Sequence, residues 1–204
     1  MIYDTQILKS QIPLDVLSHL REELYAMEPR DSFWRAPSSD YFYLSDELVE
    51  KLLEFIPLLP NETAVVMGVK NNVPTGLHTD ANPYYADSFD MHSYARTFVI
   101  PLETLETSTI LFDQLMPRGI QGTGKEMVRY IKQLPDINSI TTEDINKYFK
   151  WLAQDFWINK LSIQETFSWV EGDIVTFDVY RIHTGDCHAP EIKKNFIFIW
   201  TYIN

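Results

Sequence analysis

The sequence predicts a mainly β fold with flanking helices and one helical insertion. The chain has 204 residues, of which 45% are hydrophobic and 14% aromatic, so it can bury a core of its own, and large aromatic side chains favour packed sheets. From residue 63 onward, short strand-like runs alternate with turn residues, and they resume near the C-terminus. Residues 1–204 are therefore expected to form a single domain.

Two amphipathic stretches near the N-terminus predict helices that support this domain. Residues 14–27 and residues 45–56 carry apolar side chains at helical spacing, and a proline precedes the first stretch and follows the second. The first ten residues are compatible with a short edge strand. Residues 1–61 are therefore expected to provide mainly helical support.

A second helical region interrupts the β pattern at residues 115–162. Within it, Thr141-Thr142-Glu143-Asp144 resembles the N-terminal cap of a helix and leads into apolar residues at helical spacing. About 50 residues rarely sustain an independent core, so we interpret this region as an insertion into the β fold. It is a candidate lid over a site, or a candidate contact between the two copies of a homodimer.

Charge and composition narrow the range of partners and compartments. The formal net charge of −12 opposes binding to phosphate backbones, so nucleic acid is an unlikely partner and a small-molecule or peptide substrate is expected. No apolar run approaches the roughly 20 residues needed to cross a bilayer. The single cysteine and the absence of a signal-peptide pattern predict a cytoplasmic protein.

Two fragments predict a metal site. His78 and Asp80 follow a turn-prone segment, and on a strand they would project from the same face. His183 follows the predicted strand at residues 174–178 after one short turn, and it is the strongest candidate for a third ligand. Two imidazoles and one carboxylate leave adjacent coordination positions open, an arrangement that suits Fe(II). His188, five residues further on, is a rival ligand.

These fragments and the strands around them resemble the Fe(II)/2-oxoglutarate-dependent oxygenases. The resemblance covers roughly residues 62–203 apart from the insertion, and its parts occur in the order that the family requires. It implies a double-stranded β-helix, the cupin-like jelly roll, with iron at the mouth of the barrel. The segments that carry it are Leu77-His78-Thr79-Asp80, Arg96-Thr97-Phe98-Val99-Ile100-Pro101-Leu102, Gly172-Asp173-Ile174-Val175-Thr176-Phe177-Asp178, Arg181-Ile182-His183 and Lys194-Asn195-Phe196-Ile197-Phe198-Ile199-Trp200.

The resemblance also implies a basic residue that binds the far carboxylate of 2-oxoglutarate, some ten residues beyond the distal histidine. Lys193 and Lys194 both lie in that range. Neighbours on a strand point to opposite faces, so only one of them can enter the barrel, and we rank Lys194 first. Arg181 lies two residues before His183 and could contact the co-substrate or the substrate. It could equally pair with Asp178 or Asp186.

Four other residues are candidate substrate contacts. Asn82, Tyr84 and Tyr85 closely follow the first metal ligands, where the family often places loop residues of the active site. Arg96 opens a predicted strand and could serve an acidic substrate, although a structural ion pair is the stronger expectation for it, since the chain has 29 acidic side chains.

The function that the resemblance implies is that of a dioxygenase that uses Fe(II), 2-oxoglutarate and O2. It would hydroxylate a C–H bond of its substrate and release succinate and CO2. Two other interpretations stay open. One is a different cupin-like metalloenzyme that does not use 2-oxoglutarate, and the other is a non-catalytic jelly-roll binding module.

Overall fold

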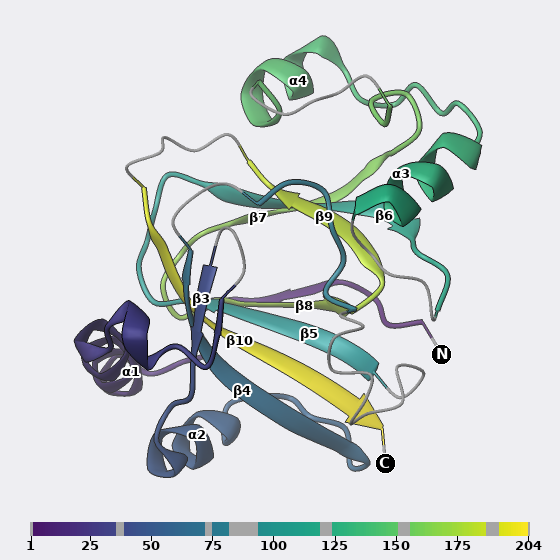
Figure 1. Ribbon diagram of the computed structural model, residues 1–204. Helices are drawn as coiled ribbons and strands as arrows, with labels where there is room; N and C mark the ends of the chain where they lie inside the picture. The colour runs from purple at the N-terminus through teal and green to yellow at the C-terminus, as the bar shows by residue number, and fades with distance from the viewer. Residues whose placement is uncertain are drawn as a thin grey trace.

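Two antiparallel sheets that face each other form the frame of the molecule (Figure 1). The computed structural model describes residues 2–35, 39–71, 75–81, 94–118, 124–150, 156–186 and 192–203. A seven-stranded sheet has the order β1-β8-β5-β10-β4-β3-β2, and a three-stranded sheet has the order β7-β6-β9. The strands are β1 (Gln6–Leu8), β2 (Trp34–Arg35), β3 (Ser39–Phe42), β4 (Glu62–Asn71), β5 (Tyr94–Pro101), β6 (Ser108–Leu115), β7 (Ile163–Ser168), β8 (Ile174–Asp178), β9 (Arg181–Gly185) and β10 (Lys194–Ile203).

The alternation of side chains along the strands divides the core into two parts. In β10, Phe196 and Trp200 belong to or pack against the hydrophobic cluster between the two sheets, which also includes Phe177 of β8. Ile197 and Ile199, one residue out of phase, belong to a second cluster on the outer face of the large sheet. The period of two along a strand thus gives β10 one face toward the barrel interior and one toward the helices.

Helices cover the outer face of the large sheet. They are α1 (Leu14–Ala26) and α2 (Asp46–Leu53), with a short 3-10 turn, η1 (Pro29–Asp31), between them. The apolar side of α1 is fully buried at Leu20 and Leu24. A Cβ at Gly68 of β4 would lie 2.7 Å from the Cδ1 atom of Leu24, so glycine at this position lets α1 approach the sheet.

The helices α3 (Gly124–Gln133) and α4 (Thr142–Tyr148) lie between β6 and β7 in the chain and over the small sheet in space (Figure 1). Phe149 and Trp157 of this region pack against Phe112 of β6, with ring centroids 6.1 and 5.9 Å from that ring. Met127 and Ile131 of α3 join the same cluster. The second helical region therefore packs on the sheet through an aromatic contact.

The elements confirm a mainly β fold with flanking helices, with two local differences. β2 and β3 extend the large sheet within residues 1–61, where mainly helices were expected. The segment around His78 is also not a full strand, because it pairs with β9 through a single bridge to His183. Among the described residues, no helix is long and apolar enough to span a bilayer.

Candidate metal centre

Backbone pairing brings His78 beside His183. The N–H group of each histidine donates to the carbonyl oxygen of the other, both at 3.0 Å, so their side chains lie on the same side of the ladder, with ring centroids 4.1 Å apart. The N–H group of Asp80 donates to the Val179 carbonyl oxygen at 3.0 Å. This bond attaches the Asp80 segment to the turn between β8 and β9, and it brings the carboxylate to the two imidazoles.

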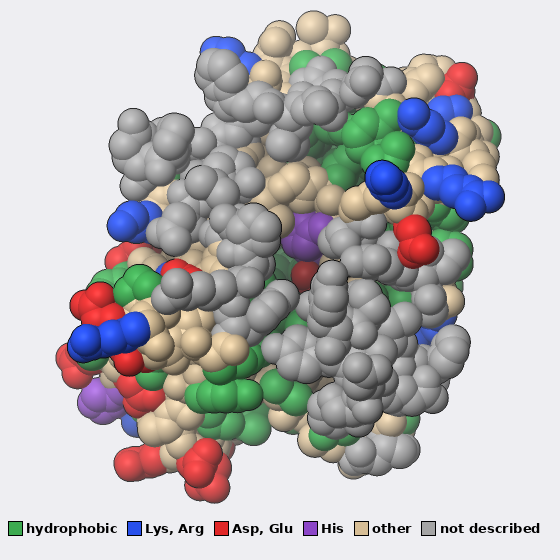
Figure 2. All heavy atoms as spheres, viewed as in Figure 1, with side chains coloured by type: hydrophobic (Ala, Val, Ile, Leu, Met, Phe, Trp, Pro, Cys, Tyr) green, Lys and Arg blue, Asp and Glu red, His purple; other side chains and the backbone are tan. Residues whose placement is uncertain are grey.

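The three side chains present their ligand atoms toward one another. One ligand atom from each of His78, Asp80 and His183 lies within 4.8 Å of the others. The Oδ1 atom of Asp80 is 3.4 Å from the Nε2 atom of His183 and 3.8 Å from the Nε2 atom of His78. Figure 2 shows a histidine side chain in a hollow near the middle of this face, next to an acidic side chain.

The second nitrogen of each imidazole is held by the backbone. The Nδ1 atom of His78 lies 2.7 Å from the Gly76 carbonyl oxygen, and the Nδ1 atom of His183 lies 2.9 Å from the Arg181 carbonyl oxygen. A carbonyl oxygen only accepts hydrogen bonds, so each Nδ1 atom carries the proton and each Nε2 atom keeps its lone pair. Metal-binding histidines are usually oriented in this way.

The electrostatics of the cluster also fit a cation. The Oδ2 atom of Asp80 is buried without a hydrogen-bond partner among the described residues. Burial raises the pKa of Asp80, but the two histidines lower it more, and the net pKa is below its usual value. Burial and then the nearby His183 lower the pKa of His78 to about 4. The cluster thus offers a carboxylate and a neutral imidazole, the forms that bind metal ions.

Of the two histidines in the cluster, His183 has the higher pKa. Burial opposes a charge on its imidazole, but the Asp80 carboxylate outweighs burial and raises the pKa of His183. A divalent cation would replace the proton that this pair attracts. Two imidazole nitrogens and one carboxylate, with no thiolate among them, fit Fe(II) with open coordination positions better than a closed zinc site.

Lys194 reaches the barrel interior beside this cluster. The residue is 3% exposed, and its Nζ atom donates to the Ser108 carbonyl oxygen at 3.3 Å and lies 4.5 Å from the centroid of the Trp169 ring. A Cβ at Gly185 would lie 3.7 Å from the Nζ atom. Because Gly185 is two residues after His183 on β9, the ammonium group lies on the same side of that strand as the imidazole.

Within the described part of the chain, the ammonium group of Lys194 has no direct counter-ion. No carboxylate of the described residues forms an ion pair with it, and the nearby Asp186 accepts hydrogen bonds from the Thr107 hydroxyl and the Ser108 N–H group. Burial lowers the pKa of Lys194 to about 8, although Asp186 partly opposes this shift. An anion that enters the barrel would therefore meet a buried cation at this point.

Solved structures with the same fold were found by comparison. The α-ketoglutarate (2-oxoglutarate) dependent carbocyclase SnoK of nogalamycin biosynthesis has a TM-score of 0.59 at 12% identity, and the match covers 98% of this chain and 80% of that one. HygX from Streptomyces hygroscopicus, solved with nickel and 2-oxoglutarate, gives 0.55 at 10% identity, with 98% and 83% covered. A Pseudomonas putida prolyl-4-hydroxylase gives 0.53 at 9% identity, with 98% and 92% covered. No protein-family model and no curated protein matches the sequence.

The fold is that of the iron- and 2-oxoglutarate-dependent enzymes. This confirms the double-stranded β-helix that the sequence resemblance implied. In this fold, the cluster of His78, Asp80 and His183 lies where the small sheet meets the segment that follows β4.

Two other residues were candidates for binding the co-substrate, Lys193 and Arg181, and neither shares the position of Lys194. Lys193 is exposed, whereas its neighbour Lys194 is buried in the barrel. The guanidinium group of Arg181 donates to the carbonyl oxygen of Phe112 at 2.8 Å and more weakly to that of Asp113 at 3.3 Å, so it holds an irregular part of β6. Arg181 therefore supports the barrel wall beside His183.

Arg96 does not reach the candidate site. Its Nε atom donates to Glu62 at 2.8 Å, its guanidinium group forms a second bond to the same carboxylate, and a third bond reaches the Pro57 carbonyl oxygen at 2.9 Å. It also stacks over Phe98, which belongs to the cluster on the outer face of the large sheet. The structural ion pair, which was the stronger expectation for Arg96, is therefore confirmed, and it occupies the guanidinium group.

The remaining candidates lie outside the described residues. They are Asn82, Tyr84, Tyr85 and the rival ligand His188.

Trp169 was not anticipated from the sequence, although its ring lies against Lys194. Trp169 directly follows β7, and no predicted metal ligand is near it in the sequence. Only the packing of the two sheets against each other brings its ring to Lys194.

Proposed function

We propose that this protein is an Fe(II)- and 2-oxoglutarate-dependent dioxygenase. The observation that carries the proposal is the convergence of His78, Asp80 and His183, with both Nδ1 atoms held by carbonyl oxygens and both Nε2 atoms turned toward the carboxylate. These three residues would hold the iron. Bound Fe(II), together with 2-oxoglutarate and O2, supplies the oxidising power that breaks a C–H bond.

Lys194 would bind the far carboxylate of 2-oxoglutarate. Its ammonium group is buried in the barrel and lies two residues along β9 from the level of His183. The contacts with Trp169 and the Ser108 carbonyl oxygen fix its position before the ligand arrives, which reduces the ordering cost of binding. Exposed Lys193 cannot serve from the same strand position, because neighbours on a strand point to opposite faces.

We propose hydroxylation of a small molecule or a peptide as the reaction. One atom of O2 would enter the substrate as a hydroxyl group, and the other would enter succinate as 2-oxoglutarate loses CO2. The neighbours with this fold include an epimerase, a carbocyclase and a prolyl-4-hydroxylase. A product heavier than its substrate by one oxygen atom would support hydroxylation, and an unchanged mass or a loss of two hydrogen atoms would favour one of the other outcomes.

The test of co-substrate binding needs no substrate. Protein mixed anaerobically with Fe(II) and 2-oxoglutarate is expected to develop the weak visible charge-transfer band of the chelate. His78→Ala should abolish the band, and Lys194→Ala should raise the 2-oxoglutarate concentration needed to form it. Lys193→Ala is the matched control, since it removes the same charge from the neighbouring, exposed position.

Two results would contradict the proposal. Absence of both the band and bound Fe(II) in the wild-type protein would favour the non-catalytic jelly-roll module. Bound Fe(II) without any response to 2-oxoglutarate would favour a metalloenzyme that does not use this co-substrate.

A further inference from the structure

A large pocket lies beside the candidate metal centre, between the segment that precedes His78 and helix α3. It has a volume of about 860 Å³, within the range of small-molecule sites. Gly76 and Leu77 form one wall, and the adjacent residue His78 is a member of the metal cluster. The remaining lining residues come from the helical insertion: Gly124, Lys125, Met127, Val128, Arg129, Lys132, Gln133, Phe156 and Trp157.

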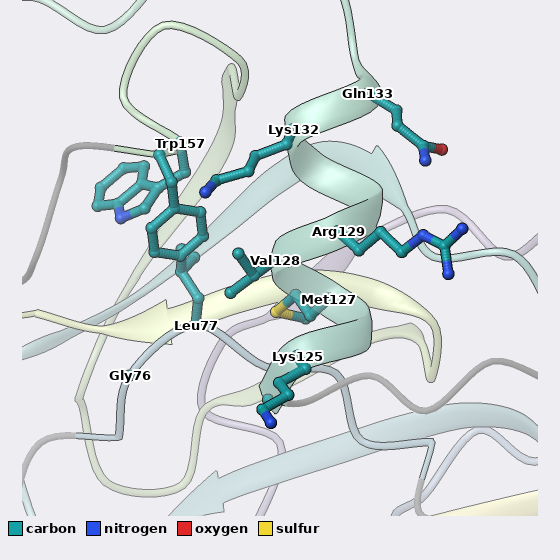
Figure 3. Close-up of a pocket in the computed structure, with 11 residues that line it drawn as sticks. Gly76, Leu77, Lys125, Met127, Val128, Arg129, Lys132, Gln133 and Trp157 are labelled. Atoms are coloured by element: carbon teal, nitrogen blue, oxygen red, sulfur yellow. The ribbon is translucent and has the colours of Figure 1, made fainter.

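The pocket combines an apolar body with a cationic edge. Lys125, Val128 and Lys132 are spaced three and four residues apart, so they share one face of α3. Figure 3 shows Val128 and Lys132 pointing from the helix toward Trp157 and Leu77, whereas Arg129 points to the other side of the helix. An occupant would thus meet the apolar residues in the body of the pocket and the lysines at its edge.

The positive charge of α3 contrasts with the rest of the chain. The helix carries three cations and one acidic residue, Glu126, which does not line the pocket, while the whole chain has a net charge of −12. Lys125, Arg129 and Lys132 are exposed, and none of them forms an ion pair with another described residue. Basic side chains gather over α3 on the face that Figure 2 shows. Opposite charge at this edge would attract an anion to a protein that otherwise repels it.

We propose that this pocket binds an amphipathic anion, with an apolar body against Leu77, Val128 and Trp157 and a carboxylate or phosphate group at Lys132. Lys125, about 10 Å further along the helix, adds positive charge at the same edge. This inference rests on the proposed function in one respect, because the anion is taken to be the molecule that the enzyme oxidises. The anionic end would anchor the molecule at α3, outside the barrel, and the part to be oxidised would extend past Leu77 toward His78.

The binding test uses three probes of the same shape and different charge: phenylbutyrate, phenylbutanol and phenylbutylammonium. Calorimetric titration of protein loaded with Mn(II) and 2-oxoglutarate should give the tightest binding for phenylbutyrate. The double variant Lys125→Gln/Lys132→Gln should weaken phenylbutyrate binding about tenfold, as expected for loss of charged hydrogen bonds, and should leave phenylbutanol binding nearly unchanged. Lys132→Glu should reverse the preference in favour of phenylbutylammonium.

Matched variants separate this pocket from the barrel site. Lys147→Gln removes one charge from the exposed surface of α4, outside the pocket, and should not change phenylbutyrate binding. Lys193→Gln removes one exposed charge next to β10, outside the pocket, and should also leave it intact. The proposal is overturned if the three probes bind equally, or if Lys147→Gln weakens binding as much as the pocket variants do.

A second readout tests the link to the reaction. Because Leu77 adjoins His78, phenylbutyrate in the pocket is expected to change the visible band of the Fe(II) and 2-oxoglutarate complex. Probe binding that depends on Lys132 but leaves this band unchanged would contradict the assignment of the pocket to the substrate. Absence of the band in the unliganded protein, with probe binding retained, would instead count against the proposed oxygenase function alone.

Discussion

Lys194 is a buried ammonium group at the point where an anionic co-substrate is expected. Burial lowers its pKa to about 8, while the proposed contact with 2-oxoglutarate requires the protonated form. Below pH 8 the lysine carries its charge before binding. Above pH 8, binding must be accompanied by uptake of a proton, so the apparent affinity should fall as the pH rises, approaching tenfold per pH unit.

This gives a prediction for titrations of 2-oxoglutarate between pH 7 and pH 9. The dissociation constant of the wild-type protein should be nearly constant up to pH 8 and should increase above it. Lys194→Arg should show a much flatter profile, because a guanidinium group keeps its proton throughout this range. An equal decline in both proteins would show that another group is responsible.

Side chains of strand β5 point alternately to the barrel interior and to the outer face of the large sheet, and Arg96 is on the outer face, away from the metal cluster. Arg96 pairs with Asp178 of β8 along the backbone, and its side chain lies with Phe98 on the outer face. Glu62, whose side chain is 0% exposed, receives the Arg96 guanidinium group and the Thr201 hydroxyl. Since this ion pair joins β4, β5 and β10, we assign it to the stability of the large sheet.

We expect Glu62→Gln to lower the free energy of unfolding by about 3–5 kcal/mol at pH 7, because it leaves a buried guanidinium group without its counter-ion. Urea denaturation measures this change. The double variant Glu62→Met/Arg96→Met should be less destabilised than Glu62→Gln, since it removes both charges. If the double variant is the less stable of the two, the pair itself contributes more than its desolvation costs.

The same pair predicts a loss of stability in acid. Burial raises the pKa of Glu62, but its hydrogen bonds with Arg96 and the backbone lower it more, so the net pKa lies below 4.5. A lowered pKa means that the folded protein binds fewer protons than the unfolded chain. The contribution is therefore complete above about pH 4.5 and is lost as the pH falls through the folded pKa.

The sequence predicted those elements whose evidence is local. The turn at Gly172 and the apolar run after it predicted strand β8. The His78-x-Asp80 pattern and the place of His183 just after that strand predicted the residues that converge. The choice between Lys193 and Lys194 could only be ranked, because a shift of one residue reverses the faces of a strand. The ion-pair partner of Arg96 is Glu62, which lies 34 positions earlier in the chain, and no local sequence pattern indicates such a contact.

At the scale of the whole molecule, the metal cluster joins segments that are far apart in the chain. His78 and Asp80 follow β4, while His183 belongs to β9 of the small sheet. The unfolded chain cannot present all three ligands together, so a metal ion should bind the folded state far more tightly. Metal binding is therefore also a measure of whether the barrel is closed.

Mn(II), which accepts oxygen and nitrogen ligands, is a suitable probe for a thermal unfolding test. At about 100 times its dissociation constant, a ligand that binds only the folded state adds about 2.7 kcal/mol. For a chain of this length, each kcal/mol corresponds to roughly 2–4 °C, so the expected rise in Tm is about 5–10 °C. His183→Ala should remove this rise, whereas Lys193→Ala should retain it.

Each variant is compared with and without the metal, so a general loss of stability does not affect the difference. A full shift in His183→Ala would mean that the ion binds elsewhere, and it would contradict the assignment of the three ligands.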